Sequence, residues 1–184
     1  MRIVAAILLI FALTPGSSAQ EGSSQIVFLR PRLGTAFIDN SRSVILRVQE
    51  RVPEAQMVGI GGGGTKITYR VNPGQHLFVV IAGNADFMVA NVLPNTTYYV
   101  WVQYLPSGNV RNQYSFKLVD SREQNSKEFK DSVAAAKATE NDPASASWLA
   151  ANLPSVRKRM QEYYGRWLQK PASERVVLGE PSTQ

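Results

Sequence analysis

The sequence predicts a mainly β fold, an antiparallel β-sandwich of about eight short strands followed by a C-terminal α-helical extension. Two compositional regions support this prediction. Residues 25–120 are rich in β-branched and aromatic residues, with glycine, proline and asparagine at short intervals, as between strands. From Arg122 onward the chain is rich in alanine and charged residues, which is typical of helices. The 184 residues suffice for one domain with an appendage.

The candidate strands differ in how many of their faces are apolar. Residues 44–48 and 65–71 alternate apolar and polar side chains, which predicts one buried face and one wet face. Residues 76–82 and 97–104 are apolar on both faces, which predicts central strands or strands covered by the helical tail. The other candidate strands are residues 25–30, 56–60, 86–92 and 112–119.

The tail predicts two or three helices. Ser126 can cap a helix that runs to about Lys137, and Asp142 followed by Pro143 marks the start of another. Pro154 then interrupts this helix or restarts it. Apolar side chains spaced by four and three residues form one stripe, which we expect to pack on the sandwich. The stripe comprises Leu149, Leu153, Val156, Met160, Tyr163 or Tyr164, and Trp167.

The first 19 residues match a signal peptide. Arg2 supplies a positive start, Ile3 to Leu13 form an apolar core of 11 residues, and small residues precede a cut near Ala19. The apolar core is shorter than the roughly 20 residues that span a bilayer. We therefore expect a periplasmic or secreted protein with no transmembrane segment after cleavage. The expected organisation is a signal peptide at 1–19, a β-sandwich domain at 20–121, a helical extension packing on it at 122–170, and a loose tail at 171–184.

The composition excludes many kinds of active site. The chain has no cysteine, which removes disulfides, thiolate nucleophiles, cysteine-ligated metals and cysteine-linked lipid anchors. Its one histidine, His76, excludes a two-histidine metal site, and we expect it to form a structural hydrogen bond at the start of a strand. We therefore expect no metal, no cofactor and no catalytic residue.

The formal net charge of +6 raises the question of a polyanionic partner. The charge is spread over both regions, and export argues against nucleic acid. The densest basic group lies in a segment with helical spacing, where we favour a solvated face. The alternative is a surface that binds an acidic envelope polymer or an anionic membrane. Its candidate residues are Arg157, Lys158, Arg159, Arg166 and Lys170.

Residues 59–64 formally contain the G-x-G-x-x-G pattern of dinucleotide-binding loops. Such a loop must open a helix, whose N-terminal amides hold the pyrophosphate. Here the strand pattern of residues 65–71 follows instead. We therefore predict a flexible hairpin tip.

Tyr99, Trp101 and Gln103 share one face of the strand at 97–104. Aromatic rings beside an amide suit a platform for a sugar or peptide. The same residues suit a sheet buried beneath a helix, which we favour because the tail offers aromatic covering groups. These are Trp148, Tyr163, Tyr164 and Trp167.

Carboxylates could also serve a glycosidase, which needs a pair of them across a cleft. The candidates lie at apparent strand ends or loops, and nothing in the sequence marks a pair. They are Asp39, Glu50, Glu54, Asp86 and Asp120.

Four stretches at strand starts and turns carry a family resemblance: residues 27–31, 71–76, 93–100 and 116–119. They resemble a bacterial family of exported proteins with a domain of unknown function, related to PEGA-like and transthyretin-like β-sandwiches. The resemblance covers about half of the chain and implies an antiparallel sandwich at the cell envelope without a known reaction. Many members look like lipoproteins, but a lipid anchor does not carry over because this chain lacks cysteine.

These observations predict a non-enzymatic, exported module with a binding or structural role at the bacterial cell envelope. Its partner would be an envelope protein or a polysaccharide. Two alternatives stay open: a carbohydrate-active hydrolase that uses loop carboxylates, and a polyanion-binding protein that uses the basic helix.

Overall fold

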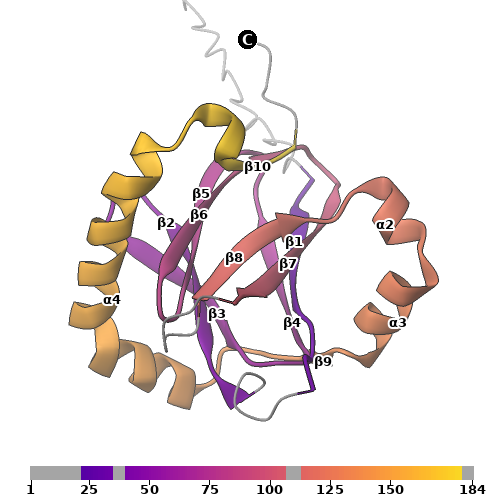
Figure 1. The fold of residues 1–184 in the computed structure, drawn as a ribbon, viewed down its shortest axis with the longest axis horizontal. Coiled ribbons are helices and arrows are strands. Elements are labelled where there is room, and N and C mark those ends of the chain that lie inside the picture. Colours follow the sequence, from indigo (N-terminus) through magenta and orange to yellow (C-terminus); the bar gives the residue numbers. More distant parts are fainter. Residues whose placement is uncertain (1–21, 35–39, 107–112, 180–184) are drawn as a thin grey trace, which may run out of the picture.

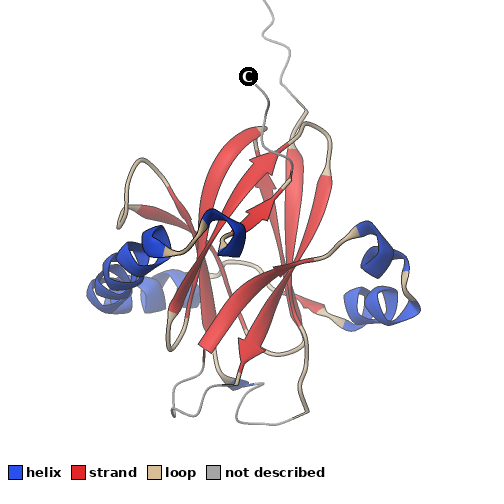
Figure 2. Cartoon of the chain, turned by 45° about the horizontal axis from the view of Figure 1, so that its top comes forward, coloured by secondary structure: helices blue, strands red, loops and turns tan. Residues whose placement is uncertain are grey.

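Two five-stranded sheets face each other, and helices lie outside both of them (Figure 1, Figure 2). The structure is a computed structural model that describes residues 22–34, 40–106 and 113–179. The first sheet has the order β8-β7-β1-β4-β9 and the second β10-β6-β5-β2-β3. The strands of the first sheet are β1 (Ser24–Arg30), β4 (Thr65–Val71), β7 (Thr97–Leu105), β8 (Gln113–Leu118) and β9 (Lys137–Ala138). Those of the second are β2 (Ser43–Val48), β3 (Ala55–Gly61), β5 (Gly74–Ile81), β6 (Ala85–Val92) and β10 (Val176–Leu178).

The mainly β prediction is confirmed, with two differences. All eight expected strands are present, and the tail adds β9 and β10, so the described residues form ten. The sheets are also mixed, because β1 pairs with β7, β4 with β9 and β6 with β10 in parallel. The parallel pairs arise because the chain passes repeatedly from one sheet to the other before it returns beside an earlier strand.

The helices are α2 (Ser121–Asn125), α3 (Lys127–Ala135), α4 (Pro143–Gln169) and the 3-10 turn η1 (Ala172–Glu174). Ser126 caps α3 by accepting a hydrogen bond from the Phe129 amide at 3.1 Å. Asp142 caps α4 in the same way, through the Ser145 amide at 2.6 Å. Both predicted starts are confirmed. Pro154 lies inside α4 without ending it.

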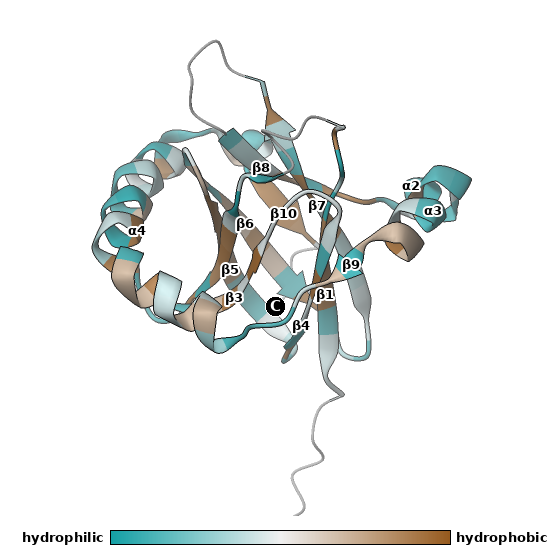
Figure 3. Ribbon diagram, turned by 90° about the horizontal axis from the view of Figure 1, so that it is seen from below, coloured by the Kyte–Doolittle hydropathy of each residue, from teal (hydrophilic) through white to brown (hydrophobic). Residues whose placement is uncertain are grey.

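The tail covers both sheets. The apolar stripe of α4 packs on the outer face of the second sheet, where Val156, Met160 and Trp167 are buried. The hairpin of α2 and α3 covers the outer face of the first sheet through Phe129. In Figure 3 hydrophobic colour lies on strands in the middle of the molecule, whereas α2 and much of α4 are hydrophilic.

The core between the sheets is aromatic at its centre. The ring of Phe28 lies 5.6 Å from that of Phe78 and 5.8 Å from that of Phe116, each measured between centroids. Strand β2 differs from its predicted pattern, because both of its faces are buried. Ile45 belongs to this central core, whereas Val44 and its alternating neighbours pack under α4. The face of β2 that was expected to contact water is therefore covered by protein.

The glycine-rich segment 59–64 is not a hairpin tip. It carries the chain from β3 in the second sheet to β4 in the first. Gly64 has a φ of +74°, and a side chain on Gly61 would lie 2.8 Å from the hydroxyl of Thr65. The glycines therefore permit a sharp crossing between layers. No helix follows them, as the strand pattern predicted.

The C-terminal segment that was expected to be loose contributes a strand. Val176–Leu178 pairs in parallel with Met88–Ala90 of β6, and Leu178 is buried in the central core. Val176 and Leu178 pack on the central core, which explains why this segment is a strand, whereas Val177 is exposed. The predicted signal peptide at 1–19, Asp39 and residues 180–184 of the predicted tail lie outside the described residues.

Within the described ranges, no helix combines the length and the apolar character that crossing a membrane requires.

Candidate functional site

A cavity of about 450 Å³ lies beside the C-terminal half of α4. Its walls come from the end of β2 and the loop after it, the start of β5, Val89 of β6, and two aromatic residues of α4. The lining residues are Arg47, Val48, Gln49, Glu50, Arg51, Val52, Gln75, His76, Leu77, Val89, Tyr164 and Trp167.

Trp167 lines this cavity and carries a hydrogen-bond donor that the fold does not use. Its side chain is 6% exposed, and the indole Nε1–H has no hydrogen-bond partner among the described residues. Buried N–H groups are nearly always paired, and leaving one unpaired costs about 1–3 kcal/mol. A ligand oxygen that displaces the protein atoms covering this nitrogen would satisfy the donor.

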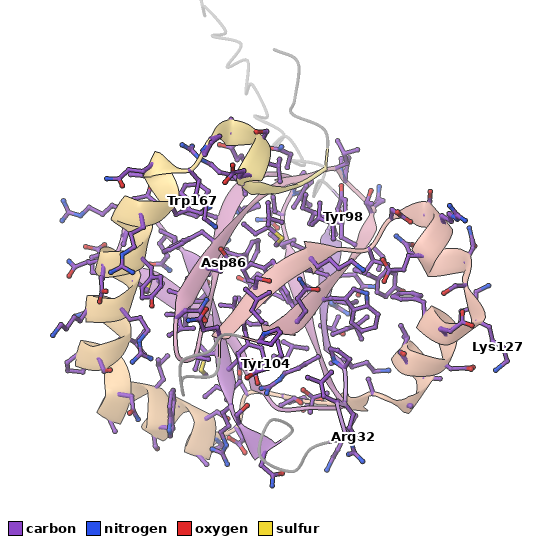
Figure 4. The ribbon with its side chains drawn as sticks, viewed as in Figure 1. Arg32, Asp86, Tyr98, Tyr104, Lys127 and Trp167 are labelled. Atoms are coloured by element: carbon purple, nitrogen blue, oxygen red, sulfur yellow. The ribbon has the colours of Figure 1, made fainter. Side chains whose placement is uncertain are left out.

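Trp167 lies in the C-terminal part of α4 (Figure 4), and packing fixes the orientation of its indole. Its plane stacks on Tyr164 at a centroid distance of 5.7 Å and an angle of 16°, and Phe87 lies 5.7 Å away. The guanidinium of Arg175 lies 5.0 Å from the ring centroid. The faces of the Trp167 ring are therefore covered by protein groups.

The other polar groups of the cavity can both donate and accept. Gln75 donates from Nε2 to Asn91 Oδ1 at 3.0 Å, which holds its amide in place and leaves Oε1 as an acceptor. Gln49 and Glu50 are exposed at the loop after β2. Alternation along the strands places Val48 and Leu77 on the α4 side, where they give the cavity an apolar wall.

Arg47 also has a buried unpartnered donor, Nε, but it lies on the other side of β2. Its neighbours Leu46 and Val48 face α4, so alternation directs Arg47 away from the helix. Arg47 Nη2 donates to Gln56 Oε1 of β3 at 3.1 Å. We therefore do not count the Nε of Arg47 with the donor of Trp167.

His76 has the structural role that the sequence predicts. Its Nε2 lies 2.8 Å from the backbone oxygen of Asn72, which can only accept, so Nε2 donates. The bond closes the turn between β4 and β5 and occupies this ring nitrogen.

The predicted platform of Tyr99, Trp101 and Gln103 lies on the outer face of the first sheet. The rings of Tyr99 and Trp101 contact Phe129 of α3 edge to face, at 5.2 and 5.7 Å. Trp101 donates from Nε1 to Glu123 at 2.6 Å. Helix cover is thus confirmed, but the covering group is Phe129, because the tail aromatics that we expected there pack mainly on the second sheet.

The five basic residues predicted for anion binding do not act as one group. Arg159 donates to the backbone oxygen of Ala82, and Arg166 pairs with Glu162 at 2.8 Å. Lys170 Nζ lies 3.6 Å from Asp86. The remaining two, Arg157 and Lys158, are exposed.

The described carboxylates that were candidates for a hydrolase have different structural roles. Glu54 pairs with Arg51 at 3.4 Å, and Asp120 caps α2 through the Glu123 amide at 2.7 Å. Asp86 is buried, and Glu50 lines the cavity. Among the residues that the structure describes, no group of three or more acidic or histidine side chains could hold a metal ion.

Asp86 joins three parts of the fold (Figure 4). From β6, its carboxylate pairs with Lys170 after α4 and accepts a hydrogen bond from the Phe116 amide of β8 at 3.3 Å. Nearby Asn84 exchanges two hydrogen bonds of 2.8 and 2.9 Å with the backbone of Tyr114. Asp86 and Asn84 therefore give hydrogen-bond partners to backbone groups on the free edge of β8.

We expect the Asp86 carboxyl to make stability fall as pH rises. Burial raises its pKa above the usual 3.8, although Lys170 and the Phe116 amide oppose the shift. Because the folded state then binds the proton more tightly than the unfolded state, the free energy of unfolding decreases as pH rises from 3.8 through the raised pKa. Urea unfolding across this window should show a smaller decrease for Asp86→Asn than for the wild type.

Asp142 supplies a control of opposite sign. The Ser145 amide lowers the pKa of Asp142, so its stabilisation is present above 3.8 and is lost as pH falls through the lowered value. Asp142→Asn should therefore weaken acid destabilisation. Identical pH profiles for Asp86→Asn and the wild type would contradict the effect assigned to Asp86.

No protein-family model matches this chain, and no curated protein sequence matches it either. The resemblance to PEGA-like sandwiches therefore stays a prediction.

Sequence reasoning included Trp167 in the apolar stripe of α4 but did not assign it to a site. Its neighbours in the cavity come from β2, β5 and β6, which the sequence does not show to be adjacent. One signal was present: an indole, whose N–H needs a partner, ends an otherwise apolar stripe.

Proposed function

We propose that this protein is an exported, non-catalytic binding module of the bacterial cell envelope, and that its cavity beside α4 binds a saccharide segment of an envelope polysaccharide. The observation that carries the proposal is a cavity of about 450 Å³ lined by Trp167, whose buried N–H has no partner among the described residues. Cavities of this size hold small ligands, commonly with a few fixed polar groups among apolar ones.

The polar groups favour a saccharide because sugar hydroxyls both donate and accept. The indole of Trp167 supplies a donor, Glu50 supplies an acceptor, and the Gln75 amide supplies an acceptor with its position already fixed. The wall of Val48 and Leu77 suits the apolar face of a sugar ring. Export is supported by the signal-peptide pattern of residues 1–19.

Calorimetric titration with maltotriose, cellotriose and chitotriose tests the proposal. We expect at least one of these neutral trisaccharides to bind with a Kd of about 1 mM or tighter. Trp167→Phe should weaken that binding by about 2- to 10-fold, because it removes one hydrogen bond and keeps an aromatic ring. Trp101→Phe is the matched control and should leave the Kd unchanged, because Trp101 lies on the opposite sheet.

Two results would reject this assignment. One is the absence of binding for all three sugars at about 10 mM. The other is an equal effect of the two tryptophan substitutions. Product analysis in the same samples tests the hydrolase alternative: cleavage that Glu50→Gln abolishes would favour it over a binding module.

The polyanion alternative has less support from the basic residues. Arg159, Arg166 and Lys170 have partners within the fold, and each would have to give them up to bind a polymer. Binding of a soluble polyanion that weakens steeply with salt would revive this alternative.

A further inference from the structure

A second cavity, of about 380 Å³, lies beside the N-terminal half of α4. It differs from the first in being almost entirely apolar. Its lining residues are Leu46, Pro53, Ala55, Met57, Ala146, Leu149, Ala150, Leu153, Val156, Arg157 and Met160.

Two alanines on α4 contribute to this cavity. Ala146 and Ala150 lie one turn apart and face the same way as Leu149 and Leu153. Larger side chains at these two positions would extend the stripe over β3. The cavity therefore forms where the stripe has small residues, and its opposite wall is Ala55 and Met57 of β3.

The single charged lining residue is Arg157. Its side chain is exposed, and no ion pair or hydrogen bond of the guanidinium occurs among the described residues. The next residue, Lys158, is also exposed. An apolar cavity beside an uncommitted cation is complementary to a molecule with one apolar chain and one anionic head.

We propose that this cavity binds a free single-chain fatty acid, with the acyl chain against the apolar wall of β3 and α4 and the carboxylate beside Arg157. The site is separate from the saccharide cavity and does not depend on it. The occupant is a fatty acid and not a bilayer lipid, because a single cavity of about 380 Å³ suits one acyl chain, whereas a bilayer lipid has two.

A chain-length series tests the apolar half of the proposal. Octanoate, decanoate and dodecanoate are titrated calorimetrically into the purified protein, below their critical micelle concentrations. Each methylene buried should tighten binding about fourfold, so each step of two carbons should tighten it about 15-fold until the cavity is full. A Kd that does not change with chain length would overturn the proposal.

Two substitution pairs locate the site. Ala150→Leu fills the cavity and should weaken dodecanoate binding at least 10-fold, whereas Ala151→Leu, at an exposed position outside the lining, should leave it unchanged. Arg157→Gln should weaken dodecanoate binding about 2- to 5-fold but leave dodecanol binding unchanged. Lys158→Gln is its control, because Lys158 does not line the cavity.

Equal effects within either pair would reject this location. If dodecanol bound as tightly as dodecanoate, Arg157 would have no role and the site would be a general apolar one. Co-sedimentation with phosphatidylglycerol vesicles but no binding of free dodecanoate would assign the surface to a membrane and overturn the fatty-acid proposal.

Discussion

Replacing Phe129 with alanine is expected to lower the free energy of unfolding by about 3–5 kcal/mol, the usual range for a buried phenylalanine. Phe129 is 6% exposed and is the one buried residue of α3, and α2 has none. Its ring contacts Tyr99 and Trp101 edge to face. The alanine variant therefore loses the main anchor of the α2–α3 hairpin on the first sheet.

Urea unfolding followed by circular dichroism measures this effect. Phe129→Leu keeps most of the apolar volume and should cost less than the alanine variant. Lys130→Ala, at an exposed position on the same helix, should change the free energy of unfolding by less than about 0.5 kcal/mol. A loss below about 1 kcal/mol for Phe129→Ala would mean that the hairpin is not anchored as the structure indicates.

Met160→Ala should lower the free energy of unfolding by about 2–5 kcal/mol. Met160 is fully buried between α4 and the second sheet, in the cluster that also contains Val156 and Phe87. Shortening it leaves a void that α4 cannot easily close, because Val156 and Trp167 also hold this part of the helix on the sheet.

The volume-conserving Met160→Leu separates void formation from other effects and should cost less than about 1.5 kcal/mol. Gln161→Ala tests helix propensity at an exposed neighbour and should be close to neutral. If Met160→Ala unfolded at the same urea concentration as the wild type, α4 would not be a firmly packed layer.

The sequence predicted the strands because alternation and turn residues are local signals. Residues 65–71, for example, form β4 with the predicted bounds, and Ile67 and Val71 face the core. Pairing between strands is not a local property. Nothing near Gly61 or Gly64 shows that the two flanking strands belong to different sheets, so a hairpin was the natural but wrong prediction.

The candidate sites were harder to predict than the fold. The stripe of α4 was identified from its spacing, and so was its role in packing. Both cavities, however, depend on which strand each turn of the helix covers. Trp167 lines one cavity together with Val89 and Leu77 of the second sheet. Ala150 lines the other together with residues of β3. Such neighbours are a result of tertiary structure.

The two strands of the tail, β9 and β10, complete the two sheets at their edges. β9 pairs with β4 and β10 pairs with β6, each at one edge of a sheet. Without the tail, the backbone groups of Thr65 and Lys66 in β4 and of Met88–Ala90 in β6 would lack these strand partners. An unpaired edge is a template for strands of other chains. The two tail strands thus pair with sheet edges that would otherwise be open to strands of other chains.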